Sequence, residues 1–506
     1  MTAHIDFLRH QSLLVLLMAS VALPPAGLVL LWIRRGTKAL WKLLGTIPIL
    51  GIAVAHLFLF FGLRVELDGT GARPMFSFGS AESHIEQLEA SRAALPAAAP
   101  APSPPTVEAA PAVAASAPAA PPYWTAFRGP NRDGHYDETP ILTAWPKRGL
   151  ARLWKQPVGG GYASVVVAGG RVFTIEQRRD REVAAAYDVN SGRELWTNSW
   201  AANFRESMGG DGPRATPTWH EGMLYALGAE GELRCLEAAT GKVVWSKNIL
   251  ADNGAANVTW AMSASPLIVD EKVIVQPGGP GGRSVVAYHK LTGAPVWKAL
   301  DDKQAYTSPM LVTLGGRRQI VTVTASRVVG MAPEDGALLW EYPWVTEYDV
   351  NASQPIVTGP NRFFISAGYG HGAAVVELRP AANTFTARTV WQNMRMKNKF
   401  NPSVLHEGHI YGLDEGILAC VDAGTGQQKW KGGRYGYGQL LLASGHLVVT
   451  TESGEAVLVK ATPERHEELA RFSAVEGKTW NVPALAGGLL FVRNTTEMAC
   501  FRITPN

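Results

Sequence analysis

The sequence predicts an all-β fold, an eight-bladed propeller, preceded by two N-terminal transmembrane helices and an Ala/Pro-rich linker. Aromatic residues recur at a period of about 40 to 50 residues, and short β-type runs separated by turn residues lie between them. Two apolar runs open the chain, each near the ~20 residues that cross a bilayer as a helix. The net charge of +4 over 506 residues is small, which argues against nucleic acid as a partner.

The two apolar runs, residues 13–33 and 43–63, predict a two-helix membrane anchor. The connection between them carries four basic residues, whereas the tail before the first run has only Arg9; the four are Arg34, Arg35, Lys38 and Lys42. The positive-inside rule places this connection in the cytoplasm and both chain ends on the far side. The sequence thus predicts an inner-membrane protein with its propeller in the periplasm. The alternative is a cleaved signal peptide, with LMASVA as the cleavage region.

Composition divides the chain into four parts. Residues 1–64 form the two-helix anchor, and residues 65–94 form a juxtamembrane segment with a short helix capped by Ser80 or Ser83. The stretch LRVELDGTGARPMFSFG within that segment is expected to be short and irregular. Residues 95–122 are almost entirely Ala and Pro and predict an extended, semi-rigid linker. Residues 123–506 carry the repeat.

The recurring phrase joins a small residue, a turn-forming Thr-Gly or its equivalent and a tryptophan, as in LRCLEAATGKVVWSK, residues 233–247. Glycine supplies the positive φ of a tight hairpin. The indole offers a large apolar surface that can fill the space between neighbouring blades. The predicted docking residues are Trp154, Trp196, Trp245, Trp297, Trp340, Trp391 and Trp430, with Phe472 in the next equivalent place.

The same register assigns the cysteines a structural role. A small residue precedes five of the tryptophans by ten positions; these residues are Ala186, Cys235, Ala287, Gly330 and Cys420. Cysteine behaves there as a small hydrophobe, and Cys500 occupies the matching strand of the last repeat. The three cysteines then belong to blades two, six and eight, too far apart to form a disulfide.

The last repeat, residues 482–503, ends before its own tryptophan. A strand near residues 153–158 is expected to complete it and close the ring, which removes exposed sheet edges. Eight blades follow from this count. The repeats at residues 375–391 and 457–472 are degenerate, and they leave seven blades as the alternative.

The phrases LACVDAGTGQQKW, residues 418–430, and AYDVNSGRELW resemble the tryptophan-docking repeat of pyrroloquinoline-quinone (PQQ) propellers. The segment WTAFRGPNRDG, residues 124–134, looks like the lead-in of a group similar to the propeller protein of the outer-membrane barrel-assembly machinery. The resemblance implies an eight-bladed ring but not PQQ, because many relatives keep the repeat for stability alone. The quinoprotein dehydrogenase propellers it also resembles add Ca²⁺, an Asp base and a disulfide between adjacent cysteines.

Residues just before each predicted inner strand are candidates for a binding site at the channel mouth. Three positions before the strand lie the candidate cofactor-binding residues Tyr162, Arg214, Tyr306, Lys399, Tyr437 and Trp480. One position before it lie Ser164, Thr216, Ser265, Ser308, Gln354, Asn401, Gln439 and Val482. The functional interpretation is a pocket for a flat anionic ligand, with aromatic stacking and charge pairing to Arg214 or Lys399. The alternative is a water-filled channel lined by solvated polar residues.

Two loops stand out near these positions. Residues 207–217 are glycine-rich, and Asp211 is placed to orient Arg214 or simply to form a turn. Residues 366–374 carry Tyr369 and His371 between glycines. No carboxylate occurs one or three positions before the inner strands, and no cysteines are adjacent. The sequence therefore assigns neither catalytic residues nor metal ligands.

Two functions remain open at this point. The favoured hypothesis is a membrane-anchored periplasmic scaffold that binds proteins or peptides of the cell envelope without a cofactor, with Trp219, Trp260 and Trp344 as candidate anchors or buried packing residues. The alternative is a PQQ-dependent oxidoreductase with the cofactor at the channel mouth.

Overall fold

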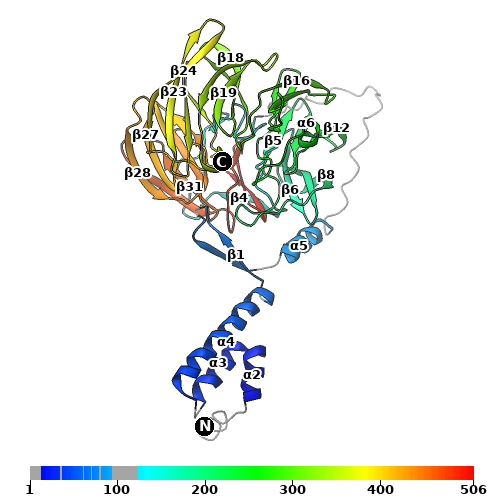
Figure 1. Ribbon diagram of the computed structural model, residues 1–506, viewed down its shortest axis with the longest axis vertical. Helices are drawn as coiled ribbons and strands as arrows, with labels where there is room; N and C mark the ends of the chain where they lie inside the picture. The colour runs from blue at the N-terminus through cyan, green and yellow to red at the C-terminus, as the bar shows by residue number, and fades with distance from the viewer. Residues whose placement is uncertain are drawn as a thin grey trace. The chain divides into compact units, whose positions relative to one another are not determined.

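The computed structural model describes residues 13–34, 37–60, 62–69, 71–78, 81–93 and 123–505. By contacts the chain divides into two compact units, Met1–Leu67 with Pro74–His84, and Asp68–Arg73 with Ile85–Asn506. The linker predicted at residues 95–122 and the predicted cap Ser80 lie outside the described residues. Figure 1 labels the helices and strands of both units.

The first apolar run forms two short helices instead of one spanning helix. These are α2 (Leu13–Ala22) and α3 (Pro24–Ile33), each ten residues long. Pro24 and Pro25 cause the break, because proline has no N–H to continue a helix but fits the first turn of a new one. The prediction of two spanning helices is therefore wrong for this run, since ten helical residues extend only about 15 Å.

The second apolar run forms α4 (Ala39–Leu59) of 21 residues, the one helix in the described part of the chain that is long and apolar enough to cross a membrane. Helices α2, α3 and α4 contact one another. The juxtamembrane stretch that was expected to be irregular forms a hairpin of β1 (Leu63–Leu67) and β2 (Pro74–Phe78). The predicted short helix is confirmed as α5 (Ala81–Ala93), with Ser83 inside it.

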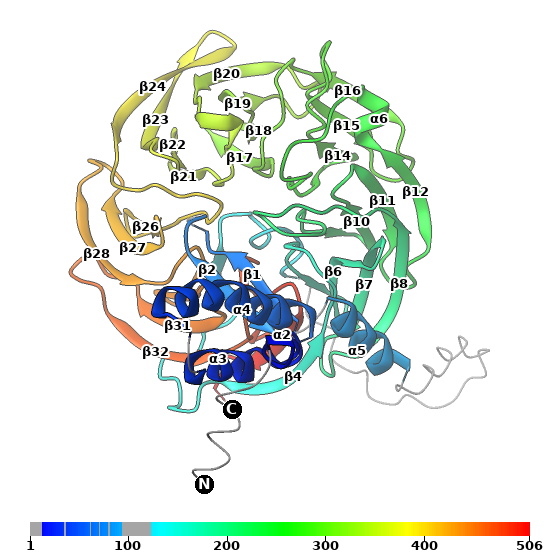
Figure 2. The same ribbon diagram turned by 60° about the horizontal axis from the view of Figure 1, so that its bottom comes forward.

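In the second unit, the described strands form eight sheets arranged in a ring, which confirms the eight-bladed propeller (Figure 2). In Figure 2 the four strands of a blade follow one another from the centre of the ring to its periphery, as β17, β18, β19 and β20 show. Blade 1 consists of β5 (Val166–Ala168), β6 (Arg171–Arg178), β7 (Arg181–Asp188) and β8 (Glu194–Ala201). Blade 2 consists of β9 (Thr218–His220), β10 (Met223–Leu227), β11 (Glu232–Glu237) and β12 (Val243–Asn248), followed by α6 (Ile249–Asn253).

The next four blades repeat the pattern. Blade 3 consists of β13 (Leu267–Val269), β14 (Lys272–Val275), β15 (Val285–His289) and β16 (Pro295–Ala299). Blade 4 consists of β17 (Met310–Leu314), β18 (Arg317–Val323), β19 (Arg327–Met331) and β20 (Leu338–Pro343), followed by the turn η1 (Glu347–Asp349). Blade 5 consists of β21 (Ile356–Gly359), β22 (Arg362–Ala367), β23 (Gly372–Ala381) and β24 (Thr384–Asn393). Blade 6 consists of β25 (Val404–His406), β26 (His409–Asp414), β27 (Ile417–Asp422) and β28 (Gln428–Arg434).

The last two blades show how the ring closes. Blade 7 consists of β29 (Gln439–Ala443), β30 (His446–Thr450), β31 (Glu455–Lys460) and β32 (Glu468–Ser473), with β3 (His135–Tyr136) added beside β29. Blade 8 consists of β33 (Ala484–Ala486), β34 (Leu489–Arg493) and β35 (Glu497–Arg502), and its outer strand is β4 (Ala151–Pro157) from the start of the propeller. The predicted closure is thus confirmed, and the degenerate repeats are complete blades.

The recurring tryptophans join each blade to the next. Six indole N–H groups donate to a backbone carbonyl in the turn of the following blade at 2.8 to 3.2 Å; the donors are Trp154, Trp196, Trp245, Trp297, Trp391 and Trp430. The turn glycine lies against the ring. Gly241 has a φ of +74°, and a Cβ there would lie 2.5 Å from Cε3 of Trp196. The Thr-Gly of the phrase is therefore required both by the turn and by the docked indole.

Two positions keep the docking role with different partners. The N–H of Trp340 donates to Gln319 within blade 4, while its ring stacks on Phe363 of blade 5 at 5.0 Å between centroids. Phe472 packs against Phe501 of blade 8 with centroids 5.0 Å apart. The apolar core consequently lies between blades, in clusters that each join neighbouring sheets.

The small residues predicted before each tryptophan are confirmed by the strand register. Cys235 pairs with Trp245, Cys420 with Trp430, and Cys500 with Trp154, each next to a register shift. All three thiols are buried and free. Burial raises the pKa of Cys235 to about 11, so the thiolate form is disfavoured and the residue serves as a small hydrophobe.

Candidate functional site

The candidate site lies where the loops that lead into the inner strands gather, here called the mouth of the channel. The polar residues one position before the inner strands do not line an open channel, because they are buried and bonded across blade boundaries. Ser164 N donates to Thr216 Oγ1 at 2.9 Å, and Ser265 N donates to Ser308 Oγ at 2.9 Å. Gln354 exchanges two hydrogen bonds with the backbone of Ser308. The expectation of solvated residues is wrong for this set, which forms an inter-blade belt.

The predicted aromatic residues at the mouth come together in one arc. The rings of Tyr162 and Trp480 lie 5.3 Å apart, and Phe400 bridges onward, 4.7 Å from Trp480 and 6.0 Å from Tyr437. Lys478 Nζ lies 4.5 Å from the Trp480 ring. A cation over an aromatic face is attracted by the ring quadrupole, so this arc combines apolar surface with positive charge.

Arg214 extends the arc at one end. Its guanidinium lies 5.6 Å from the Tyr162 ring and 4.9 Å from Phe204. It donates to the carbonyls of Gly212 at 2.5 Å and Gly210 at 2.6 Å. Burial lowers its pKa. Backbone carbonyls hold the guanidinium. Asp211 accepts from Glu206 N at 3.2 Å, which agrees with the alternative that Asp211 forms a turn.

Tyr306 does not take part in the ring contacts that join Tyr162, Trp480, Phe400 and Tyr437. Its ring is 5.8 Å from that of Trp260, and burial raises its pKa to about 12. Trp344, suggested as an exposed anchor, is only 2% exposed and packs edge-on against His371 at 4.3 Å. Trp219 and Trp260 are partly buried.

Lys399 and Tyr437 form the other end of the arc. Lys399 Nζ lies 4.6 Å from the Tyr437 ring and 4.9 Å from the Tyr369 ring. It also donates to the carbonyl oxygen of Gly69 at 2.8 Å. Burial lowers the pKa of Lys399. The turn Asp68–Arg73, which belongs to the propeller unit, therefore contacts the mouth.

Glu452 is a mouth residue that the sequence did not reveal. It lies between β30 and β31, a loop outside the inner-strand register. Its Oε1 accepts from Gly69 N at 2.7 Å and Trp480 Nε1 at 2.8 Å, and its Oε2 accepts from Tyr437 N at 3.2 Å. The only sequence signal was an acidic residue in the TESGE turn, which is ordinary for a surface turn.

The lead-in segment fills the channel behind the mouth; residues 123–136 are called the plug. Its carbonyls at Trp124, Thr125 and Gly134 accept from inner-strand N–H groups of blades 1, 2 and 7 at 2.8 Å. Arg132 donates to the carbonyls of Ser265, Pro266 and Pro309 and to Thr218 Oγ1, and Arg128 donates to Ser403 O at 2.8 Å. The alternative of a water-filled channel is wrong along the length that the plug occupies.

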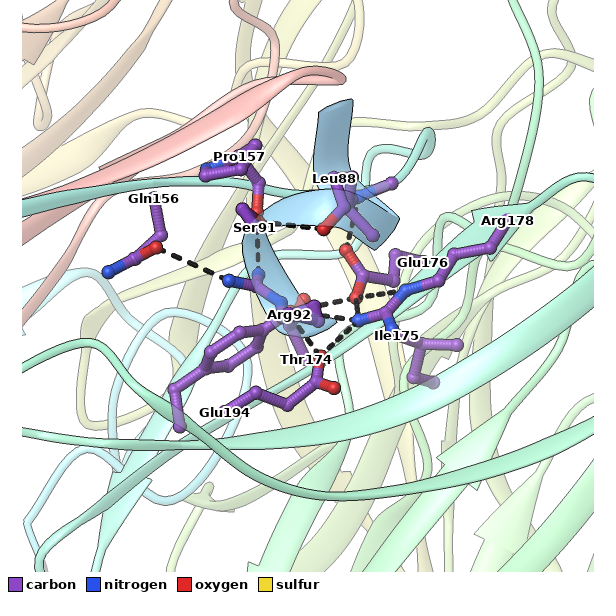
Figure 3. A network of polar contacts seen from close by, with 12 residues as sticks. Leu88, Ser91, Arg92, Gln156, Pro157, Thr174, Ile175, Glu176, Arg178 and Glu194 are labelled. Atoms are coloured by element: carbon purple, nitrogen blue, oxygen red, sulfur yellow. Dashed lines mark hydrogen bonds and ion pairs between the residues drawn. The ribbon is translucent and has the colours of Figure 1, made fainter. Parts of the chain in front are cut away.

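A second polar cluster lies at the seam of blades 8 and 1 (Figure 3). Arg92 of α5 donates to Pro157 O at 2.7 Å and pairs with Glu194 at 3.3 Å, and Arg178 bridges Glu194 to the buried Glu176. Burial alone would raise the pKa of Glu176, but Arg178 and Arg493 outweigh it and lower the pKa. Glu176 is therefore held at this seam by Arg178 and by the hydroxyl of Tyr187.

Glu182 is a buried carboxyl close to the mouth loops. It accepts from Ala229 N and Trp200 Nε1, both at 2.8 Å, and burial raises its pKa to about 7. A carboxyl with a raised folded-state pKa stabilises the fold fully below its unfolded pKa, and this contribution is lost as pH rises through the folded value.

We therefore expect Glu182→Gln to flatten the pH dependence of stability. Relative to this variant, the wild-type free energy of unfolding should fall by about 2.5 kcal/mol between pH 5 and pH 8. Urea unfolding across that range measures it, with the exposed Glu334→Gln as the control. Parallel pH profiles for wild type and Glu182→Gln would contradict the assignment.

The side chains that meet at the mouth are mainly aromatic and cationic, with Glu452 as a carboxylate among them. Ca²⁺ takes six to eight oxygen ligands, several of them carboxylate. Within the described ranges, no group of three or more His, Cys, Asp or Glu side chains could hold a metal ion. Glu452 already accepts three hydrogen bonds, and Trp480 is packed by Phe400 and Tyr162.

Comparisons with known proteins agree with this fold. The family model described as outer membrane protein assembly factor BamB matches residues 179–432. Outer membrane protein assembly factor BamB of Burkholderia pseudomallei is 21% identical over 369 residues, covering 64% of this chain and 91% of that protein. Quinoprotein alcohol dehydrogenase PedH of Pseudomonas putida is 27% identical over 173 residues, covering 31% and 27%. This chain spans 16 to 27% of the length of the alcohol dehydrogenase relatives.

Two solved structures show the same fold. BamB from Moraxella catarrhalis superimposes with a TM-score of 0.52 at 15% identity, covering 70% of this chain and 100% of that one. Quinohemoprotein alcohol dehydrogenase from Comamonas testosteroni gives 0.53 at 13% identity, covering 76% and 82%. At these identities the likeness establishes the fold alone.

Proposed function

Because this chain belongs to the family of outer membrane protein assembly factor BamB, we propose that it is a cell-envelope propeller that binds envelope proteins through the mouth face. The relative in B. pseudomallei carries a name that states a role in outer membrane protein assembly. In this proposal the N-terminal apolar segment holds the chain at the inner membrane, and the propeller acts as a scaffold and not as an enzyme.

The observation that carries the proposal is a set of exposed apolar side chains on the mouth loops, here called the rim. They are Met208 (54% exposed), Val345 (63%), Tyr348 (74%), Tyr369 (37%) and Met394 (49%). The rim adjoins the arc of aromatic and cationic side chains, since Tyr369 contacts Lys399. Exposed apolar side chains on the loops around a binding mouth are candidates for protein interaction.

Backbone conformation at the rim supports the same interpretation. Tyr348, Asp349 and Tyr369 have φ values of +61°, +60° and +56°. A left-handed conformation costs a residue with a side chain about 1 to 2 kcal/mol. Exposing Tyr348 in this way gives the fold no apolar burial in return, so binding is the better explanation.

The membrane orientation follows from charge. Arg34, Lys38 and Lys42 lie near the start of α4, and the positive-inside rule places that end in the cytoplasm. One crossing by α4 then puts the propeller on the periplasmic side whatever path α2 and α3 take.

Replacing rim residues is expected to abolish partner binding without unfolding the ring. Tyr348→Ser with Tyr369→Ser should reduce recovery of envelope proteins with the tagged full-length chain at least tenfold, since buried aromatic anchors dominate interfaces. Quantitative mass spectrometry after detergent solubilisation measures this. The matched control is Val244→Ser with Val296→Ser on outer strands, 42% and 47% exposed. Equal recovery from both double variants would refute the proposal.

We further propose that the function does not require PQQ. Titration of the full-length chain with PQQ and Ca²⁺, followed by quinone absorbance and tryptophan fluorescence, should show no saturable binding at micromolar concentration. Saturable binding that Arg214→Ala abolishes would instead establish the oxidoreductase alternative, because Arg214 is a cation of the aromatic arc.

A further inference from the structure

We propose that Lys399 and Glu452 form a clamp for a tight turn in which a glycine follows an acidic residue. The chain's own Asp68–Arg73 turn occupies this clamp. A partner protein presents an equivalent turn to the same clamp. This inference rests on the proposed function, to which it adds the chemistry of the partner.

The clamp forms hydrogen bonds with both the backbone N–H and the backbone carbonyl of Gly69. Glu452 Oε1 accepts from Gly69 N at 2.7 Å, and Lys399 Nζ donates to Gly69 O at 2.8 Å. Both bonds involve a charged group, which makes them stronger than neutral ones. Because the contacts are to the backbone, the clamp specifies a turn conformation more than a particular sequence.

Groups of the propeller other than the turn also hold Glu452 and the backbone of Lys399. Glu452 is 8% exposed, and Trp480 Nε1 and Tyr437 N hold its two carboxylate oxygens. Its own N–H donates to Tyr435 O at 2.9 Å, and its carbonyl accepts from Thr479 N at 2.9 Å. Lys399 N donates to Asn401 Oδ1 at 3.0 Å. A preorganised site loses little conformational entropy on binding.

The aromatic floor of the clamp selects glycine. A Cβ built on Gly69 would overlap Cδ2 of Tyr437, and that ring is held by Phe400 and Lys399. The φ of Gly69 is one that other residues can adopt. Glycine is required here because the backbone lies too close to the Tyr437 ring for a Cβ atom.

The acidic residue before the glycine complements Lys399. Burial lowers the pKa of Lys399, and the carboxylates of Glu415, Asp68 and Glu452 oppose that effect. Asp68 also shapes the turn, since its carbonyl accepts from Gly71 N at 2.8 Å and its Oδ1 from Arg73 N at 3.3 Å. An Asp-Gly turn thus provides charge and shape together.

The experiment measures competition between the built-in turn and the same turn added in trans. The probe is a fluorescent, disulfide-cyclised peptide with the sequence of residues 63–78, titrated against the detergent-solubilised full-length chain by fluorescence anisotropy. The Gly69→Ala chain, which cannot seat its own turn, should bind the peptide at least tenfold more tightly than wild type. A peptide carrying alanine in place of that glycine should lose binding at least tenfold.

Charge variants in the Gly69→Ala background separate the clamp from general attraction. Adding Glu452→Gln should weaken peptide binding at least tenfold, whereas adding Glu415→Gln, a neighbouring exposed carboxylate paired with Lys397, should leave it within twofold. Hydrogen exchange of residues 65–73 should accelerate at least tenfold in Gly69→Ala alone, which shows that the built-in turn has left the clamp.

The inference is overturned if the peptide fails to bind Gly69→Ala, binds it no better than wild type, or binds equally with alanine at the glycine. If those results occur while the rim double variant still loses its envelope partners, the clamp is refuted and the proposed function stands. If the peptide binds as expected but rim variants keep their partners, the clamp stands and the rim does not.

Discussion

Trp245→Ala is expected to lower the free energy of unfolding of the propeller by about 3 to 5 kcal/mol, as removal of a large buried aromatic side chain does. The indole fills the seam between blades 2 and 3 and donates to Lys290 O at 2.8 Å. Its loss leaves a cavity in a seam that cannot collapse, because the ring is closed on both sides.

Thermal and urea unfolding of the full-length chain measure this effect. The control is Trp260→Ala, since that indole is partly exposed at the mouth and contacts Tyr306. Trp245→Phe should recover more than half of the loss, because it restores most of the buried apolar area but not the N–H. A cost for Trp245→Ala no greater than that for Trp260→Ala would show that docking does not hold the blades together.

Arg132→Met is expected to destabilise the chain by about 3 to 5 kcal/mol, the scale seen when a buried charged network loses one member. The guanidinium is 2% exposed and bonds groups from blades 2, 3 and 4. Burial lowers its pKa to about 9, so the folded chain already bears a desolvation cost that its carbonyl partners offset. Methionine keeps an unbranched side chain at this position but leaves those carbonyls without donors.

Arg128→Met serves as the matched control, because Arg128 lies in the same plug and is equally buried. It donates one hydrogen bond to Ser403, while its Nε and Nη1 have no partner among the described residues. Its replacement should therefore cost at least 2 kcal/mol less than Arg132→Met, an estimate from the value of unpaired polar groups. Equal costs for both variants, measured by urea unfolding, would contradict the assigned role of the plug.

The blades could be predicted because their determinants are local and repeated. A turn glycine and a tryptophan at fixed spacing report the same contact in nearly every blade, and even the strand supplied to blade 8 by β4 follows from a missing repeat. Trp340 and Phe472 are the two exceptions. They occupy the same position in the repeat but contact different groups, so the predicted number of blades is still correct.

The mouth could be predicted only where it follows the inner-strand register. Tyr162, Arg214, Lys399, Tyr437 and Trp480 meet as expected, since one register places them on one face. Glu452 could not be found this way because it lies in the β30–β31 loop, outside the inner-strand register. Gly69 could not be found because it is 383 positions from Glu452 in the chain.

Other misses have the same physical origin. The belt residue Ser164 looked solvated because its partner Thr216 lies in another blade, 52 positions away. The first apolar run is apolar throughout, so its composition predicts one helix, but Pro24 and Pro25 divide it into two.

The most direct test of the central claim is site-specific photocrosslinking in living cells, with the photoreactive residue at Tyr348 on the rim or at Val296 on an outer strand. Position 348 is expected to form a covalent adduct with an envelope protein and position 296 is not, because only the rim faces a partner. Adducts from position 296 with none from position 348 would contradict it.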